Sequence, residues 1–229
     1  MKVIGLIQAR MGSTRLPGKV MMPLAGQPLI WHIIKRLKAV KKISDICIAT
    51  TQDEKNNILE KFSSENNIYC YRHFEEDDIV GRLNAISSMI DYDVMIKINS
   101  DCPLIDVKEI DRLLNLFIEK KLDFASNKIS NTYPLGYSFE ILSKALIGKC
   151  NNLLKHACER EFVINWIIDN RNSIKTDTIF YKKNESRYKL TIDTKEDYQL
   201  VSKIFDKLFI QNELFGIEQV LEFLENYNF

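Results

Sequence analysis

Near its start the chain reads Val3-Ile4-Gly5-Leu6-Ile7, and it then passes into the polar stretch Gln8-Ala9-Arg10-Met11-Gly12-Ser13-Thr14-Arg15-Leu16-Pro17-Gly18-Lys19. A short, continuous apolar run predicts a strand that is covered on both faces of a sheet. The stretch after it combines glycines and small hydroxyl residues with three cations, Arg10, Arg15 and Lys19. Backbone N–H groups in such a loop can approach an anion closely, so the loop is a candidate site for a triphosphate.

The alternative is that this loop is a surface turn with incidental basic residues. Its position after a buried strand favours the ligand site, because ligands of α/β sheets bind beyond the carboxyl ends of the strands. The loop is not a Walker A motif, since Val20 follows Gly18-Lys19 where a serine or threonine is required. It also lacks the G-x-G-x-x-G spacing of dinucleotide-binding loops.

Strand and helix patterns alternate along the rest of the chain. Helices are expected over 29–40, about 53–62, 79–90, 106–117, about 153–168, 194–208 and 217–224. Buried strands are expected over 46–49, 68–71, 94–98 and 190–193, and strand-like pieces lie within 128–140 and 176–192. This alternation predicts an α/β fold, with a mostly parallel sheet and helices on both faces.

Two acidic residues follow predicted strands and have no evident structural task. Asp101 lies in Asn99-Ser100-Asp101-Cys102-Pro103-Leu104-Ile105-Asp106, and Asp193 lies in Leu190-Thr191-Ile192-Asp193-Thr194. Asp106 and Thr194 are the predicted N-caps of the next helices, which leaves Asp101 and Asp193 free. One such acid alone is more often structural than catalytic. Together with the cationic loop, the pair predicts a Mg²⁺ site beside a bound triphosphate.

The composition argues against several classes of protein. The net charge of +1 argues against binding nucleic acid through bulk charge, and no apolar run is long enough to span a membrane. The five cysteines form no C-x-x-C pair, which fits free thiols in a reducing cytoplasm better than a disulfide framework or a zinc site. We therefore expect a cytoplasmic protein whose phosphate site is local.

The motifs resemble those of one enzyme family, in the same order along nearly the whole chain. Residues 8–20 look like the opening signature of the cytidylyltransferases of the spore coat polysaccharide biosynthesis protein F type, which are relatives of the acylneuraminate and 3-deoxy-manno-octulosonate cytidylyltransferases. The resemblance continues through 23–29, 48–51, 101–106 and 190–194, with Glu196 and Asp197.

The resemblance implies a fold and an activity. The implied fold is Rossmann-like, of the nucleotide-diphospho-sugar transferase type, with a mostly parallel mixed sheet in a single nucleotidyltransferase domain over residues 1–229. The implied enzyme uses CTP and Mg²⁺ in surface polysaccharide or glycan biosynthesis. A hydroxyl or phosphate of a sugar-type acceptor attacks the α-phosphorus, pyrophosphate leaves, and the metal makes a general base unnecessary.

Carried over by position, the resemblance assigns roles to residues of this chain. The nucleotide-binding set is Gln8, Ala9, Arg10, Gly12, Ser13, Arg15, Lys19 and Arg82. The catalytic set is Arg10, Lys19, Asp101 and Asp193, of which Asp101 and Asp193 bind the metal. Glu140 and Arg160 are assigned to the acceptor. The irregular segment 127–175 is a candidate acceptor-binding or dimerisation subregion of a homodimer.

Three departures from the family pattern lie in the acceptor half or at its border. Ser138 stands where the family often has an aspartate, and Phe162 and Ile164 replace a histidine and a threonine. Gly81 replaces an acid that usually precedes the arginine at 82. The triphosphate and metal signatures are complete, so nucleotidyl transfer is better defined than the acceptor. The alternatives are another nucleotide, a non-sugar acceptor, or a nucleotide-binding homologue without turnover.

Overall fold

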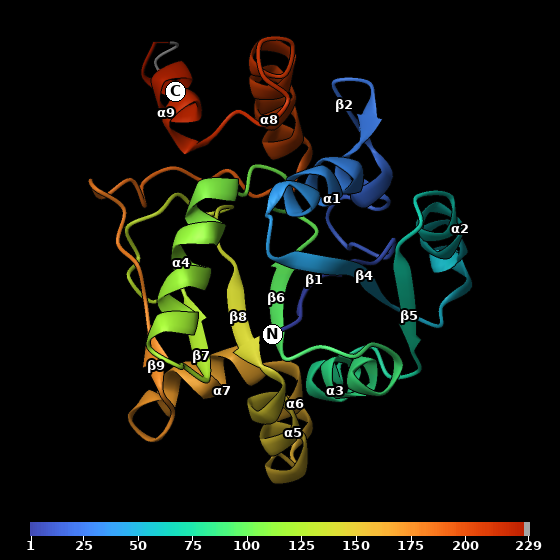
Figure 1. Ribbon diagram of the computed structural model, residues 1–229. Helices are drawn as coiled ribbons and strands as arrows, with labels where there is room; N and C mark the ends of the chain where they lie inside the picture. Colours follow the sequence, from blue (N-terminus) through green and yellow to red (C-terminus); the bar gives the residue numbers. More distant parts are fainter. Residues whose placement is uncertain (227–229) are drawn as a thin grey trace.

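One mixed sheet runs through residues 1–226, which are the part of the chain that the computed structural model describes (Figure 1). Its strand order is β5-β4-β1-β6-β8-β7-β9. The strands are β1 (Val3–Gln8), β4 (Ile43–Thr51), β5 (Tyr69–His73), β6 (Val94–Asn99), β7 (Phe124–Ser126), β8 (Glu140–Ser143) and β9 (Thr176–Asp177). β8 is antiparallel to both of its neighbours, and all other neighbouring strands pair in parallel. The predicted mostly parallel mixed sheet is confirmed.

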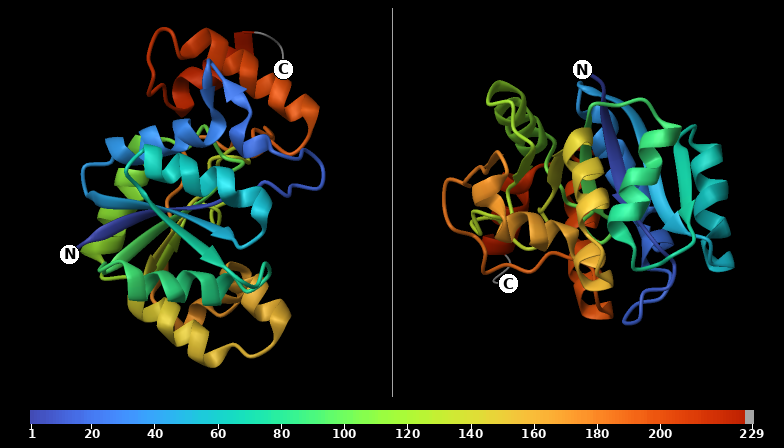
Figure 2. Two further views of the ribbon diagram at one scale, coloured as in Figure 1. Left: turned by 90° about the vertical axis from the view of Figure 1, so that its right-hand side faces the viewer. Right: turned by 90° about the horizontal axis from the view of Figure 1, so that it is seen from below.

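Helices cover both faces of the sheet (Figure 2). One buried apolar cluster joins the sheet to α1 (Leu29–Ala39), α2 (Asn57–Glu65), α4 (Val107–Glu119), α8 (Lys195–Leu208) and α9 (Ile217–Asn226). A second cluster joins it to α3 (Ile79–Met89), α5 (Lys144–Leu153) and α7 (Val163–Asp169). β1 feeds both clusters, since Val3 and Ile7 lie in the first and Ile4 and Leu6 in the second. This two-sided burial explains the continuous apolar run of β1 and confirms the predicted α/β class.

Both predicted N-caps are present. Asp106 accepts N–H bonds from Lys108 and Glu109 at the start of α4, at 2.7 and 3.4 Å. Its second carboxylate oxygen accepts the N–H of Ile217 at 2.7 Å, so one buried acid starts both α4 and α9. Thr194 forms a capping box with Asp197 at the start of α8.

The segment 190–194 differs from its prediction, because it is not a strand of the sheet. The N–H of Leu190 donates to the carbonyl of Leu135 at 2.6 Å, whereas the N–H of Ile192 donates to the carbonyl of Asp101 at 3.0 Å. The main chain therefore bonds to two separate segments instead of one neighbouring strand. This arrangement still delivers Asp193 to the carboxyl edge of the sheet.

The region 127–175 also differs in detail. The continuous helix expected over 153–168 is instead the two short helices α6 (Ala157–Glu161) and α7, because α5 ends at Leu153 and residues 154–156 are not helical. Phe162 then interrupts the helix between α6 and α7. The strand-like pieces expected in 128–140 and 176–192 are mostly irregular, and the only named strand residues in them are Glu140 of β8 and the short β9.

Two buried polar side chains of α1 bond to main-chain carbonyls of other segments. Arg36 donates to the carbonyls of Ile105 and Phe215, at 3.1 and 2.8 Å, and its guanidinium lies 4.7 Å from the centre of the Phe215 ring. His32 is 1% exposed, and its Nε2 lies 2.7 Å from the carbonyl oxygen of Leu24. None of the helices within residues 1–226 is long and apolar enough to cross a membrane.

Candidate functional site

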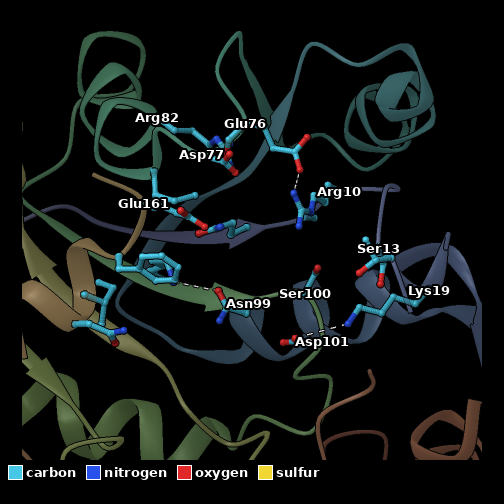
Figure 3. Close-up of a pocket in the computed structure, with 18 of the residues that line it drawn as sticks. Arg10, Ser13, Lys19, Glu76, Asp77, Arg82, Asn99, Ser100, Asp101 and Glu161 are labelled. Atoms are coloured by element: carbon cyan, nitrogen blue, oxygen red, sulfur yellow. Dashed lines mark hydrogen bonds and ion pairs between the residues drawn. The ribbon is translucent and has the colours of Figure 1, made fainter. Parts of the chain in front are cut away.

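A cavity of about 520 Å³ opens beyond the carboxyl ends of β1 and β6, where the topology predicts a ligand (Figure 3). Four stretches of chain and one lysine form its wall. The first loop contributes Gln8, Ala9, Arg10, Ser13, Thr14, Arg15 and Lys19, and β6 with the turn after it contributes Lys97, Asn99, Ser100 and Asp101. The turn before α3 contributes Glu76 and Asp77, and α3 itself contributes Ile79 and Arg82. The α6–α7 junction contributes Glu161, Phe162, Ile164 and Asn165, and the single lysine is Lys128.

Lys19 is the buried cation of the first loop. Gly18 adopts a positive φ of 72°, which favours glycine, and its N–H closes the loop on the carbonyl of Met11 at 2.9 Å. The chain then turns into a short 3-10 helix (Lys19–Met21) that directs the lysine inward. Its Nζ donates to the carbonyl of Ile192 at 2.5 Å and to Oδ1 of Asp193 at 3.2 Å.

The same amino group lies 3.7 Å from Oδ2 of Asp101, so it stands between the two predicted metal ligands. Arg15 adds a contact of 3.1 Å to Oδ1 of Asp193. The two carboxylates come from segments far apart in the sequence and converge on one cation. Within residues 1–226, no group of three or more His, Cys, Asp or Glu could hold a metal by itself. Two converging carboxylates do suit Mg²⁺, which takes one or two from the protein and completes its shell with phosphate oxygens and water.

Arg10 and Arg82 both line the cavity and both contact Glu76. Arg10 forms an ion pair with the carboxylate of Glu76, as Figure 3 shows. Arg82 is 3% exposed, and its Nη2 donates to the carbonyl of Glu75 at 3.3 Å and to that of Glu76. Burial, followed by the nearby charge of Arg10, lowers the pKa of Arg82. An anionic ligand between these two arginines would therefore relieve a repulsion.

Most of the predicted nucleotide set lies on the cavity wall, but four of the predicted site residues do not. Gly12 lies in the exposed part of the first loop, and Asp193 is reached through Lys19 and Arg15. Glu140 is buried and accepts a 3.2 Å hydrogen bond from Lys97, which itself lines the cavity. Arg160 binds Asp78 outside the wall.

Lys97 is the functional candidate that sequence reasoning missed. It is 4% exposed in the middle of the central strand β6, between Ile96 and Ile98. A lysine in an otherwise apolar buried strand is costly unless it is paired, so its presence there was the available signal. The α6–α7 junction lies in segment 127–175, the candidate acceptor-binding subregion, but its turn at Phe162 does not follow from local pattern.

Cys102 is poorly suited to act as a nucleophile. It is buried beside Asp101, with its Sγ 3.2 Å from that residue's Oδ1. Burial, reinforced by the neighbouring carboxylate, raises the pKa of its thiol well above the usual range. The thiol therefore stays protonated near neutral pH and fills the turn.

Comparisons with known proteins agree with this geometry. A family model described as "Cytidylyltransferase" matches residues 4–225. The spore coat polysaccharide biosynthesis protein SpsF of Bacillus subtilis is 28% identical over 90% of this chain and 87% of its own. The 8-amino-3,8-dideoxy-manno-octulosonate cytidylyltransferase of a Shewanella species is 32% identical over 63% of this chain and 56% of its own. A solved cytidylyltransferase of Leptospira borgpetersenii superposes with a TM-score of 0.93 at 28% identity, covering 100% of this chain and 95% of that one.

Proposed function

The chain belongs to the cytidylyltransferase family, and we propose that it transfers CMP from CTP to a sugar acid or related sugar acceptor with release of pyrophosphate. The named relatives act in spore coat polysaccharide biosynthesis and on 8-amino-3,8-dideoxy-manno-octulosonate, so the product here would serve surface glycan synthesis. Mg²⁺ is part of this proposal, as is a homodimer in which segment 127–175 contributes to the interface.

The observation that carries the proposal is the placement of Lys19 between Asp101 and Asp193, beside a loop with two further cations. Six cationic and four acidic side chains line the cavity. Arg10, Arg15 and Lys19 belong to one short loop, so the positive charge gathers at one end. That end suits a triphosphate, whereas the charges of the other lining residues, three cations and four acids, nearly cancel.

The transfer needs positioning and charge neutralisation more than it needs a covalent nucleophile. Asp101 and Asp193 would hold Mg²⁺, which neutralises phosphate charge and lowers the pKa of an attacking hydroxyl. Arg10 and Lys19 stabilise the negative charge that develops as pyrophosphate leaves. Each of the two is paired with carboxylates in the structure, and phosphate oxygens would take the place of those partners.

Lys97 is the proposed acceptor contact, with Glu140 as its support. Its ammonium group has three N–H donors, and it binds Oδ1 of Asn99 at 3.0 Å and Oε2 of Glu140 at 3.2 Å. The third donor can reach a carboxylate or hydroxyl of the acceptor, because the side chain borders the cavity. Glu140 would then act on the acceptor through Lys97 rather than by direct contact.

Pyrophosphate release tests the proposal directly. The purified protein is incubated with Mg²⁺ and each of CTP, UTP, ATP and GTP, in combination with a panel of sugar acids and neutral sugars. We expect release only with CTP and a sugar acid. Thermal shift with each nucleotide alone adds a binding readout, since a ligand at about 100 times its Kd stabilises by about 2.7 kcal/mol. Stabilisation by GTP or ATP but not by CTP would overturn the base assignment, and CTP binding without turnover would indicate a non-catalytic homologue.

A further inference from the structure

Arg160 of α6 and Asp78, the cap residue of α3, form a two-bonded ion pair between two helices that pack side by side. Nε of Arg160 donates to Oδ1 of Asp78 at 2.9 Å, and Nη2 donates to Oδ2 at 2.8 Å. Both side chains are mostly buried, with exposed fractions of 21% and 12%. Charge-assisted bonds in this parallel arrangement fix orientation as well as distance.

The rest of the Arg160 guanidinium is also engaged. Nη1 donates to the carbonyls of Leu154 at 3.0 Å and Asn151 at 3.3 Å, and Nη2 donates to Oδ1 of Asn151 at 3.0 Å. A guanidinium has five N–H donors, and these contacts use all of them. Arg160 therefore has no donor left for an acceptor, in contrast to the role that the family resemblance implied.

Asp78 has a second task, because it starts α3. Its Oδ1 accepts the N–H of Gly81 at 2.9 Å as the side-chain cap of that helix. A Cβ atom at position 81 would lie 2.1 Å from Oδ2 of Asp78, so a larger residue could not coexist with this geometry. The glycine that departs from the family pattern thus makes room for a carboxylate that caps α3 and binds Arg160 at once.

Each partner lies next to residues of the cavity wall. Asp77, Ile79 and Arg82 surround Asp78 in sequence, and Glu161 and Phe162 follow Arg160. The side chain of Arg82 bonds to the carbonyls of residues 75 and 76, so its position depends on the conformation of the turn that Asp78 ends. The ion pair therefore couples the nucleotide-side arginine to the α6–α7 junction.

We propose that Arg160 and Asp78 are positioning residues that hold Arg82 and the α6–α7 junction in register for nucleotide binding, and that Arg160 does not contact the acceptor. This inference rests on the proposed function only in that the cavity takes a nucleoside triphosphate. The two residues act as one unit, so losing either partner should have the effect of losing both.

The test is a double-mutant cycle on nucleotide binding in the absence of acceptor. Asp78→Asn keeps an oxygen that can cap α3 but removes the charge and one of the two acceptors of Arg160, and Arg160→Gln removes the guanidinium. We expect each to weaken binding of the triphosphate that the wild type prefers by about 10-fold, with the double variant no weaker than the worse single. Arg160→Lys keeps the positive charge but not the planar guanidinium. Its Kd for the triphosphate should therefore fall between those of wild type and Arg160→Gln. Exposed Lys155→Gln removes the same charge near α6 and should bind like wild type.

Three results would overturn the inference. The first is an unchanged nucleotide Kd in Arg160→Gln with a raised acceptor KM, which would make Arg160 an acceptor contact. The second is a lowered Tm with an unchanged Kd in the folded variants, which would leave the pair a purely structural role. The third is multiplicative losses in the double variant. Wild type that binds no triphosphate would be a failure of the proposed function, and it is visible before any variant is made.

Discussion

The main-chain N–H of Ile192 donates a 3.0 Å hydrogen bond to the carbonyl of Asp101, and this bond holds two distant segments together at the carboxyl edge of the sheet. It places Asp193, the next residue, on the far side of Lys19 from Asp101. The segment that carries Asp193 receives no support from a strand ladder. Its position therefore depends on a few individual contacts, and each of them can be tested.

One of these contacts is the close approach of Gly136 to the main chain of Leu190. Gly136 adopts a φ of 112°, and a Cβ atom there would lie 2.6 Å from the carbonyl carbon of Leu190. Gly136→Ala should displace the 190–194 segment, destabilise the protein by about 1–3 kcal/mol and lower kcat. Gly26→Ala is the matched control, because Gly26 also has a positive φ of 80° but a Cβ there would meet no atom within 4 Å. Urea unfolding and pyrophosphate release would measure both variants, and equal effects at the two glycines would show that contact with Leu190 is unimportant.

The cations of the first loop should act on the triphosphate. Arg10→Ala and Lys19→Ala should each weaken CTP binding or slow turnover by about 10- to 1000-fold, which is the scale of losing a charge-assisted contact. Lys41→Ala removes an exposed cation elsewhere and serves as the control. Isothermal titration with CTP and steady-state kinetics provide the measurement. Wild-type affinity and rate in both loop variants would make the loop an ordinary surface turn.

The buried pair of Lys97 and Glu140 should matter more for the acceptor than for stability. Lys97→Met alone leaves the buried carboxylate of Glu140 unpaired and should lower the free energy of unfolding by about 3–5 kcal/mol. Lys97→Met combined with Glu140→Leu should be near wild type in stability. Both should still bind CTP and should lose turnover with a sugar acid. Urea unfolding, CTP titration and pyrophosphate release separate these effects. A stable double variant with normal acceptor KM would remove Lys97 from the acceptor site.

His32 should make stability depend on pH. Burial, the leading effect, lowers the pKa of His32 from 6.5 to about 4. Between these values the unfolded chain binds more protons than the folded one, so the free energy of unfolding falls as pH falls, by up to about 3 kcal/mol. His32→Gln keeps an N–H for the carbonyl of Leu24 but does not titrate. Urea unfolding across this pH range should show the advantage of wild type over His32→Gln shrinking toward acid, and a constant difference would contradict the assignment.

Local signals in the sequence predicted the parts of the molecule that local interactions determine. The run at β1, the caps at Asp106 and Thr194 and the turn that carries Asp101 all depend on neighbouring residues. Asp193 was also predicted to be near Asp101, although the reason given, a shared sheet, was wrong. Its segment is held by single bonds to Leu135 and Asp101, which leave no periodic pattern.

The remaining site residues depend on contacts that a sequence does not display. Arg160 meets Asp78, and Lys97 meets Glu140, only because α6 packs beside α3 and β8 pairs with β6. A motif identifies Arg160 and Glu140 as noteworthy, but their partners determine what they can do. For Arg160 those partners use every donor, and for Glu140 they place Lys97 between the carboxylate and the cavity.

Asp101 and Asp193 should serve one metal ion. Asp101→Asn and Asp193→Asn keep the size of the side chain and delete its charge, and neither residue caps a helix, so folding should be nearly unaffected. We expect each to lower kcat by at least about 100-fold, on the order of losing metal-based charge stabilisation. The double variant should be scarcely worse than either single, because residues that hold one ion act as a unit.

The two acids can affect catalysis through Lys19 as well as through the metal. The lysine's ammonium group contacts both carboxylates, so removing either acid also changes the surroundings of Lys19. Titration with Mg²⁺ distinguishes the two effects. Loss of the metal site should raise the Mg²⁺ concentration needed for half-maximal rate, whereas disturbance of Lys19 alone should raise the KM for CTP at saturating Mg²⁺. Near-normal rates in one single variant would remove that residue from the metal site, and fully multiplicative losses would argue that the acids do not share an ion.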